Sequence, residues 1–461
     1  MGTKGRLGAA ACALALMAGA CTSGTADNAA DGDGATSDPS EDTTISPSDD
    51  TTAGGDDASG ELIVDAQGIT DDTIKISSVV SDLSVLSEQN LAPEIGKPEV
   101  TLDAVVAHIN AEGGVLGRDV ELVHHVVGGA DAALNPDAGR QACLQATADD
   151  QPFAVIIAAA ITVETIECVS REENVLTIAM DSIPDSIFEQ AEGRLFSLGA
   201  PTAIRQSRLY GAWPRILDDL GELDGRTIGI IRGDAFSQEV AVNDELLPAI
   251  EALGYDVASI SVLPCPEGST SCEQHDAAIQ RLKAADVDFV FLVAQVLAGS
   301  ASVEAAANLD FTPQWATIGN NITDTVARFY VNASENYDGA WGIDTGFDDT
   351  TEAAARCNEI AVANGAEEFP TADDGYSFTA VTCLQLLILL DAIEAAAETA
   401  TLTQASVIEA MEAMETVDVA IGPIGTLGPD KHDAANFVFV SRYDMAEERF
   451  LPVDPEPIPV D

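Results

Sequence analysis

Residues 109–126 read INAEGGVLGRDVELVHHV, and this stretch predicts a helix, a tight turn and a strand. The segment TLDAVVAHINAEGG (101–114) places apolar residues at positions i, i+3, i+4 and i+7, which is the spacing of one helix face. Gly113 and Gly114 end this helix, because glycine adopts the left-handed C-cap conformation without steric cost. After the turn, DVELVHHVV (119–127) alternates apolar and polar residues, as a half-buried strand does. This succession predicts an α/β fold.

Further along the chain, short apolar runs alternate with helical patterns. The runs that are rich in β-branched residues are TIKISSVV (73–80), FAVIIAAA (153–160), VLTIAM (175–180), TIGIIR (227–232), DFVFLVA (288–294) and QWATI (314–318). Continuous apolar runs between helices predict parallel strands that are buried on both faces. A Gly-Ala-Pro break at 199–201 interrupts the pattern, which then restarts. The sequence therefore predicts two similar α/β lobes, for which 461 residues are sufficient.

The composition is strongly acidic. The chain has 78 Asp and Glu residues against 20 Lys and Arg residues, a formal net charge of −58. Binding to nucleic acid depends on neutralising phosphates with Lys and Arg, so this balance argues against a nucleic-acid partner. It argues equally against docking on an anionic lipid surface. We expect a solvated acidic surface that favours solubility; whether it reflects a high-salt environment is left open.

The N-terminus has the pattern of an export signal. Residues 1–20 combine Lys4 and Arg6 with a short apolar run and small residues before Cys21. The last residues resemble the lipobox of bacterial lipoproteins, in which the cysteine is lipidated, although Ala18 stands where that motif usually has leucine. The sequence predicts a signal peptide over 1–20, with lipidation of Cys21.

The segment that follows is predicted to be a disordered tether. Residues 22–60 consist mainly of Asp, Thr, Ser, Gly and Ala, which cannot bury enough apolar surface to become ordered. We expect the lipidated cysteine and the acidic tether to occupy 21–67. The longest later apolar run, AVTCLQLLILLDAI (380–393), is too short to span a membrane and contains Gln385 and Asp391, so it predicts a buried helix.

Six cysteines remain after Cys12 and Cys21 are set aside. An even number in an exported chain favours disulfides over metal binding or catalysis. Proximity in the sequence suggests three pairs, but other connectivities stay open. The suggested pairs are Cys143–Cys168, Cys265–Cys272 and Cys357–Cys383.

No motif in the sequence predicts an enzyme. A phosphate-binding G-x-x-x-x-G-K-[ST] motif and a G-x-S-x-G elbow are missing, and GGVLGRD lacks the spacing of a dinucleotide fingerprint. His124 and His125 are adjacent, so on a strand they point to opposite faces and cannot share one metal ion. We expect no catalytic residue, no metal and no cofactor.

Several segments together resemble the type I periplasmic solute-binding proteins, in their Leu/Ile/Val-binding branch. These segments follow in the family's order over about residues 68–445: DDTIKISSVV, HINAEGGVLGRDVELV, FAVIIAAAITVETIECVSREENVLTIAMDS, RLFSLGAPTAIRQSRLYGAW, GRTIGIIRGDAFSQE and DVDFVFLVAQ. The most specific is the pattern Asn-Ala-x-Gly-Gly-x-x-Gly-Arg, which lies between the family's first helix and second strand. In this sequence it is expected to shape a turn and not to contact ligand.

The resemblance implies an architecture of two doubly wound parallel-sheet lobes joined by three crossover segments. Ligand would bind in the cleft between them, at the carboxyl ends of the strands, and closure about a hinge would trap it. The crossovers are expected near Ala200–Ile204, Tyr337–Gly342 and Thr426–Asp433. The first lobe would then comprise 68–200 and 341–427, and the second lobe 201–340 and 428–461.

The resemblance also implies a set of ligand-binding residues in the loops that follow the strands. They are Ser81, Thr162, Asp181 and Ser182 in the first lobe, and Phe236, Gln295 and Asn320 in the second. The loops depart from the family pattern, in which glycine and paired serines hold a ligand carboxylate and an acid holds an amino group. Here AAAITVET leaves Thr162 as the only hydroxyl at the position of the family's serines, and Asn320 replaces the acid. An amide or another polar solute is therefore as compatible with the sequence as an amino acid.

The predicted function is that of an extracytoplasmic solute-binding lipoprotein of an ABC importer. It would be monomeric, anchored to the outer face of the cell membrane only through its lipid, and would deliver a small polar solute to permease subunits. Two alternatives stay open: a ligand-sensing lipoprotein that acts on a separate signalling partner, and a structural envelope lipoprotein with a degenerate cleft.

Overall fold

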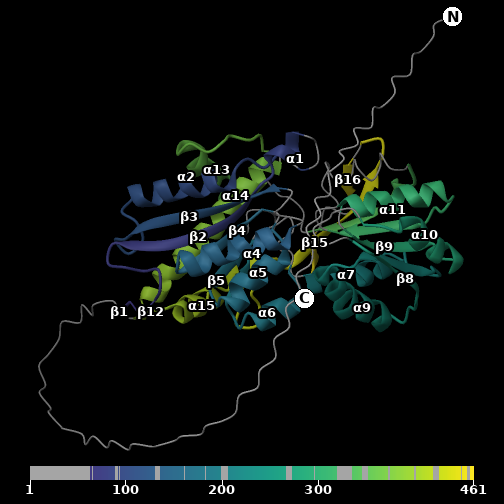
Figure 1. Cartoon of the computed structure of the whole chain (residues 1–461), viewed down its shortest axis with the longest axis horizontal. Helices are drawn as coiled ribbons and strands as arrows, with labels where there is room; N and C mark the ends of the chain where they lie inside the picture. The colour runs from purple at the N-terminus through teal and green to yellow at the C-terminus, as the bar shows by residue number, and fades with distance from the viewer. Residues whose placement is uncertain are drawn as a thin grey trace, which may run out of the picture. The chain divides into compact units, whose positions relative to one another are not determined.

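The computed structural model (Figure 1) describes residues 63–64, 66–88, 92, 94–129, 135–159, 161–181, 183–198, 206–265, 272–294, 296–318, 335–344, 351–371, 374–398, 401–418, 425–447, 449–453 and 457–460. These residues lie in one compact unit, Ser59–Asp461. The predicted signal peptide, Cys21 and nearly all of the tether lie outside the described residues. The tether prediction is wrong at its end, because β1 (Ile63–Val64) pairs in parallel with β12 (Thr401–Leu402).

The first lobe is built on a five-stranded parallel sheet in the order β3-β2-β4-β5-β6. Its strands are β2 (Thr73–Asp82), β3 (Asp119–Gly128), β4 (Ala154–Ala158), β5 (Leu176–Ala179) and β6 (Leu195–Ser197). All residues of the three short strands are buried, as the continuous apolar runs predict. Counted in chain order within the lobe, the strands follow the doubly wound order 2-1-3-4-5.

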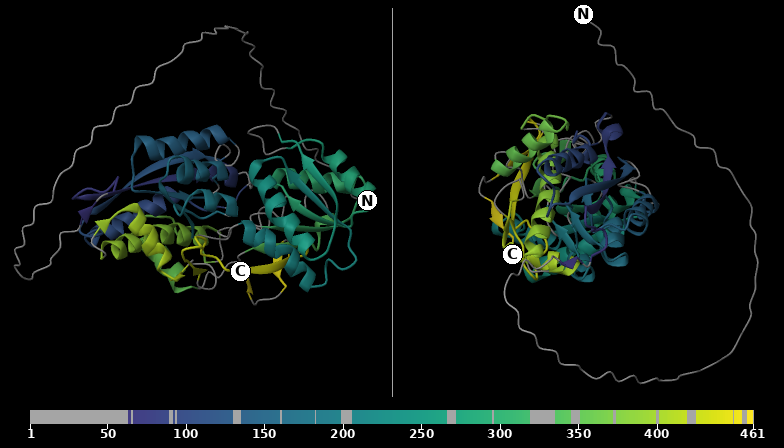
Figure 2. Two further views of the ribbon diagram at one scale, coloured as in Figure 1. Left: turned by 90° about the horizontal axis from the view of Figure 1, so that it is seen from below. Right: turned by 90° about the vertical axis from the view of Figure 1, so that its left-hand side faces the viewer.

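Helices cover both faces of this sheet. One hydrophobic core lies beneath α2 (Pro98–Ala111), α13 (Glu352–Ala363), α14 (Asp374–Ala397) and α15 (Gln404–Glu412). The other lies beneath α4 (Pro136–Leu144), η1 (Gln145–Asp149), α5 (Val163–Glu167), η2 (Cys168–Glu172) and α6 (Asp185–Gln190). Figure 2 shows the two groups on opposite sides of the strands. The short elements of this part are α1 (Ser84–Glu88), β13 (Thr416–Val417) and β14 (Gly425–Thr426).

Helix α14 is the one described helix that is long and apolar enough to cross a membrane, by length and composition alone. Two thirds of its apolar window are buried inside the protein. It packs in the first core through residues such as Leu386 and Leu389, both 0% exposed. It is therefore the buried helix that the sequence predicts.

The second lobe repeats the strand order of the first. Its sheet runs β16-β15-β11-β10-β9-β7-β8, and β17 pairs with β15 beside this path. The strands are β7 (Ile228–Gly233), β8 (Val257–Leu263), β9 (Phe289–Val293), β10 (Gln314–Ile318), β11 (Trp341–Asp344), β15 (Phe437–Asp444), β16 (Arg449–Pro452) and β17 (Ile458–Pro459). The first five are parallel in the order 2-1-3-4-5, and the last three add antiparallel pairs.

Strand β11 corrects the expected boundary at residue 341. It pairs with β10 on one side and with β15 on the other, so it belongs to the second sheet. The crossover expected at Tyr337–Gly342 is therefore wrong, and the chain leaves the second sheet only after Asp344. The other lobe boundaries stay predictions.

Helices also cover both faces of the second sheet. One core lies beneath α7 (Gln206–Asp219), η3 (Ala241–Leu246) and α9 (Leu247–Ala252), with α8 (Phe236–Val240) leading into η3. The other lies beneath α10 (His275–Ala284), α11 (Val296–Asn308) and η5 (Glu335–Tyr337).

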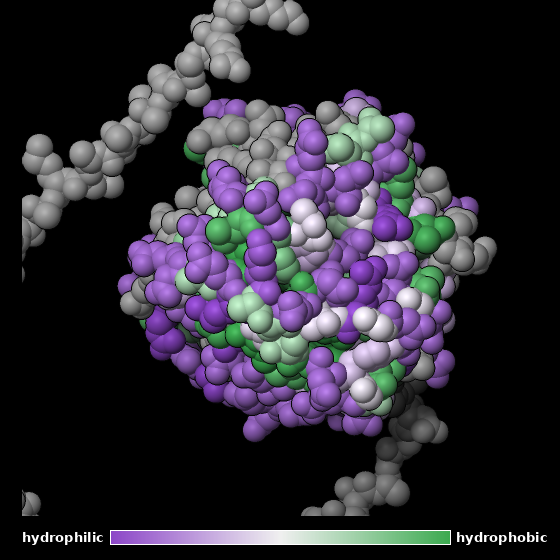
Figure 3. Space-filling model, turned by 90° about the vertical axis from the view of Figure 1, so that its right-hand side faces the viewer, coloured by the Kyte–Doolittle hydropathy of each residue, from purple (hydrophilic) through white to green (hydrophobic). Residues whose placement is uncertain are grey.

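Figure 3, which views the protein from the right-hand side of Figure 1, shows hydrophilic residues over most of that face, with smaller hydrophobic areas between them. That surface agrees with the acidic composition.

The turn that opens the sequence analysis has the structure that the glycines predict. Helix α2 ends at Ala111 and β3 begins at Asp119. Gly114 has a φ of +72°, and a Cβ atom there would lie 2.0 Å from the backbone oxygen of Arg118. The Asn110 side chain closes the turn, because it donates to Val120 O and accepts from Val120 N. This motif is structural.

The three suggested cysteine pairs are all at disulfide distance. The Sγ–Sγ distances are 2.05 Å for Cys143–Cys168, 1.89 Å for Cys265–Cys272 and 2.09 Å for Cys357–Cys383. Cys143 lies on α4 and Cys168 opens η2, so this pair joins two helices on one face of the first sheet. The pair Cys357–Cys383 joins α13 to α14 on the other face.

Candidate functional site

The carboxyl ends of the parallel strands form the candidate site. In open α/β sheets, ligands bind where the strand order reverses, which in the order 2-1-3-4-5 lies between the first and third strands. Here these are β2 and β4 in the first lobe, and β7 and β9 in the second. The sequence-predicted residues Ser81, Thr162, Asp181 and Phe236 all lie at or just after strand ends. Ser182, Gln295 and Asn320 lie outside the described residues.

Ser81 is the penultimate residue of β2. Its side chain is 0% exposed, and its Oγ atom has no hydrogen-bond partner. Burying a hydroxyl without a partner costs free energy. An unpartnered hydroxyl at this strand end is an exception that a bound ligand would explain.

Thr162 follows β4, where the family pattern places its serines. Its Oγ1 atom lies 3.0 Å from the Oγ1 atom of Thr165, so the hydroxyl already has a partner. Helix α4 approaches this turn closely, since a Cβ atom on Gly139 would lie 2.1 Å from Thr165 Oγ1. Ala159, at the place of the family's glycine, has a φ of +63°. The turn keeps the left-handed backbone that glycine would adopt, without glycine.

Asp181 follows β5 and is partly buried as a residue, but its Oδ2 atom is fully buried and has no hydrogen-bond partner. Burial disfavours the charged form and raises the pKa of this carboxyl to about 7. Its backbone oxygen accepts a 2.8 Å hydrogen bond from Ser197 Oγ, which holds the segment against the end of β6. A carboxyl without a partner in this position can accept a hydrogen bond from a ligand.

The second lobe contributes two groups that the sequence does not predict. Gln238 lies in α8, the helix that follows β7. Its Oε1 atom is buried without a partner, and a Cβ atom added to Gly233 would lie only 2.2 Å from this oxygen. Thr317, near the end of β10, is 0% exposed and has an unpartnered Oγ1 atom. Phe236 is the first residue of α8, at the expected strand end.

Arg232 is a basic residue at these strand ends, and its side chain is already paired. Arg232, near the end of β7, is 8% exposed and donates from Nη1 to the oxygen of Gly233 at 2.8 Å. Its Nη2 atom lies 3.4 Å from the carboxylate of Glu239. The buried side-chain atoms without a partner at the strand ends are therefore hydroxyls, a carboxyl oxygen and an amide oxygen.

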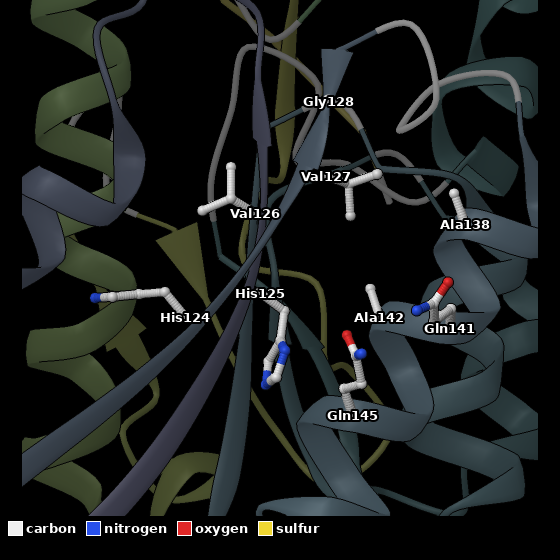
Figure 4. Close-up of a pocket in the computed structure, with 9 residues that line it drawn as sticks. All are labelled: His124, His125, Val126, Val127, Gly128, Ala138, Gln141, Ala142 and Gln145. Atoms are coloured by element: carbon white, nitrogen blue, oxygen red, sulfur yellow. The ribbon is translucent and has the colours of Figure 1, made fainter.

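A surface groove of about 370 Å³ lies apart from these groups, between β3 and the α4–η1 helix (Figure 4). His124 and His125 point away from each other, as adjacent strand residues should. His124 contacts Ser78 Oγ at 2.6 Å and Asp103 at 2.9 Å, whereas His125 contacts Asp150 at 2.6 Å. They cannot share a metal ion, and the described residues contain no cluster that could hold one.

The described residues include a passage of the chain between the two cores. Ser197 at the end of β6 pairs with Asp433, and Ala434 N donates to Ser197 O at 2.9 Å. Asp433 is fully buried, and its Oδ2 atom lies 3.1 Å from Nε of Arg208 on α7. Ala434 packs in the first core and Ala435 in the second. The chain therefore passes between the cores here, next to the segment expected to be the third crossover.

The comparisons with known proteins agree with this architecture. Residues 91–447 match the family described as periplasmic binding protein. The chain belongs to this family. The resemblance to type I periplasmic binding proteins is thereby confirmed, and the family consists of solute-binding proteins that act outside the cytoplasm with ABC transporters, not of enzymes. No curated protein matches the chain.

Solved structures show the same fold at low identity. A fatty acid ABC transporter substrate-binding protein from Thermomonospora curvata is 15% identical with a TM-score of 0.60, covering 84% of this chain and 93% of its own. A branched chain amino acid ABC transporter from Thermus thermophilus with bound valine is 14% identical with a TM-score of 0.61, and the match covers 84% of this chain and 97% of that one. A solute-binding protein from R. palustris in complex with 4-hydroxybenzoate is 15% identical with a TM-score of 0.60, covering 85% and 98%.

Proposed function

We propose that this periplasmic binding protein is a lipid-anchored receptor that captures a small polar solute and delivers it to the permease subunits of an ABC importer. The solute would bind at the carboxyl ends of both sheets, between two lobes that close on it. Ser81, Thr162, Asp181 and Ser182 would contribute from the first lobe, and Phe236, Gln295 and Asn320 from the second. The chain would act as a monomer.

The observation that carries this proposal is the repeated strand order with unpartnered polar groups at its carboxyl ends. Both parallel sheets have the order 2-1-3-4-5, whose reversal is where α/β sheets bind ligands. Buried polar groups in folded proteins nearly always have partners, so the exceptions that lie at this edge favour a binding role for it. Ser81, Asp181, Gln238 and Thr317 are such exceptions.

The lipid anchor is proposed from the sequence. The signal-like residues 1–20 and Cys21 precede an acidic, apolar-poor segment, which would hold the folded part away from the membrane surface. The exported location is also favoured by the three cysteine pairs at bonding distance.

The test is a thermal-shift screen of the purified chain over amino acids, amides, polyamines, aromatic acids and nucleobases. A solute at 100 times its dissociation constant should add about 2.7 kcal/mol to the free energy of unfolding. We expect at least one class of small solute to raise the melting temperature in a dose-dependent manner. If no compound in any class does so, the receptor function is wrong.

A further inference from the structure

We propose that the site selects a solute through its hydrogen-bond donors, such as an ammonium or amide N–H group, and not through a carboxylate. This inference rests on the proposed receptor function and specifies the chemistry of its solute. It follows from which polar atoms at the strand ends have partners and which have none.

The atoms that lack partners are predominantly acceptors. Gln238 Oε1 is an amide oxygen and can only accept a hydrogen bond. Asp181 Oδ2 can only accept when its carboxyl is ionised. Both atoms are buried without a partner. The hydroxyls of Ser81 and Thr317 can accept or donate. A hydrogen-bond donor on a solute can satisfy any one of these four groups, whereas a carboxylate would leave the two pure acceptors unpartnered and would repel an ionised Asp181.

Two groups at the described strand ends that could hold a carboxylate are already engaged. The hydroxyl of Thr162 lies 3.0 Å from that of Thr165. The guanidinium of Arg232 donates to the oxygen of Gly233 and lies beside the Glu239 carboxylate. Releasing either group for a solute anion would break a contact that exists without solute.

A carboxyl held in a low-dielectric environment gains most from a cationic donor. Charge-assisted hydrogen bonds are roughly twice as strong as neutral ones. Asp181 is therefore the group that should discriminate most strongly between an amine and an acid on the same carbon skeleton.

The experiment uses matched pairs of probes that differ only in the charged group: putrescine against succinate, 4-hydroxybenzylamine against 4-hydroxybenzoate, and isobutylamine against isobutyrate. Dissociation constants are measured by calorimetric titration of the full exported chain. We expect an amine to bind at least tenfold more tightly than its carboxylate partner in the pair that fits the site. A carboxylate that binds as tightly as its amine, or more tightly, overturns the inference and leaves the receptor function standing.

Two variants assign the effect to the site. Asp181→Asn keeps an acceptor oxygen but removes the charge, and we expect it to weaken amine binding at least tenfold. The control is Asp119→Asn, an exposed carboxylate at the first residue of β3, at the opposite end of the sheet. Equal affinities in wild type and Asp181→Asn overturn the role of Asp181. If neither an amine nor an amide binds while another solute class in the thermal-shift screen does, the donor inference is wrong and the receptor function is retained.

Discussion

The buried carboxyl of Asp181 lowers the stability of the folded protein at neutral pH. Burial raises the pKa of its carboxyl to about 7 in the folded protein, from an ordinary value of 3.8. The folded protein thus holds this proton more tightly than the unfolded chain does. The free energy of unfolding should therefore fall as pH rises from about 4 to about 7, and stay level above that range.

We expect Asp181→Asn to remove this pH dependence. Without solute, the variant and wild type should melt at similar temperatures near pH 4, and the variant should be the more stable at about pH 8, above the raised pKa. The measurement is the melting temperature of both proteins across this range, with Asp119→Asn as the control. Parallel curves for wild type and Asp181→Asn would contradict the burial of this carboxyl.

The turn after α2 offers a second test on single residues. Gly114 and Gly117 have φ angles of +72° and +73°, but only Gly114 would place a Cβ atom against backbone, 2.0 Å from Arg118 O. Gly117→Ala should therefore cost only the left-handed conformation, about 1–2 kcal/mol. Gly114→Ala should cost clearly more, measured as the free energy of unfolding in urea. Equal losses would show that the turn adjusts to the extra atom.

Sequence reasoning at the residue scale succeeds where chemistry is local. The glycine turn is predicted because a left-handed backbone needs glycine at that point of the chain. Gln238 and Thr317 are missed because their lack of partners depends on which distant groups surround them after folding. Thr162 is predicted as a ligand-binding hydroxyl, and its contact with Thr165 appears only once a short helix forms after β4.

At the scale of elements, periodicity predicts the strands but not every pairing. The apolar runs before residue 320 correspond to strands β2, β4, β5, β7, β9 and β10. The sequence places β11 on the wrong side of a lobe boundary, because sheet membership depends on long-range partners such as β15. The same reason hides the pairing of β1 with β12, which are separated by most of the chain.

The cysteine pairs provide a prediction at the scale of elements. Mass spectrometry of the exported protein without reductant should show three disulfides and no free thiol among the six cysteines. Cys143–Cys168 and Cys357–Cys383 each join two helical segments across 25 and 26 residues of sequence. Detection of free Cys143 or Cys357 in the native protein would contradict this arrangement.

For the whole molecule, we propose a folded solute-binding part and a separate lipid anchor at Cys21. Cys21→Ser should release the protein from membranes without changing the melting temperature of the folded part, because lipid chains supply the membrane affinity. The measurement is fractionation of cells into membrane and soluble material, with a Cys12→Ser variant as the control. A variant that still sediments with membranes would show that another feature holds the protein there.

We propose that one solute binds to both lobes at the carboxyl ends of their parallel strands. The most direct test is calorimetric titration of the solute found by thermal shift into wild type, Asp181→Asn and Phe236→Ala, one variant for each lobe. We expect one solute per chain and at least tenfold weaker binding in both variants, with the unliganded melting temperature of Phe236→Ala unchanged because a cleft residue contributes little to folding. Undiminished affinity in either variant, or a large drop in melting temperature for Phe236→Ala with affinity unchanged, would contradict a site shared between the lobes.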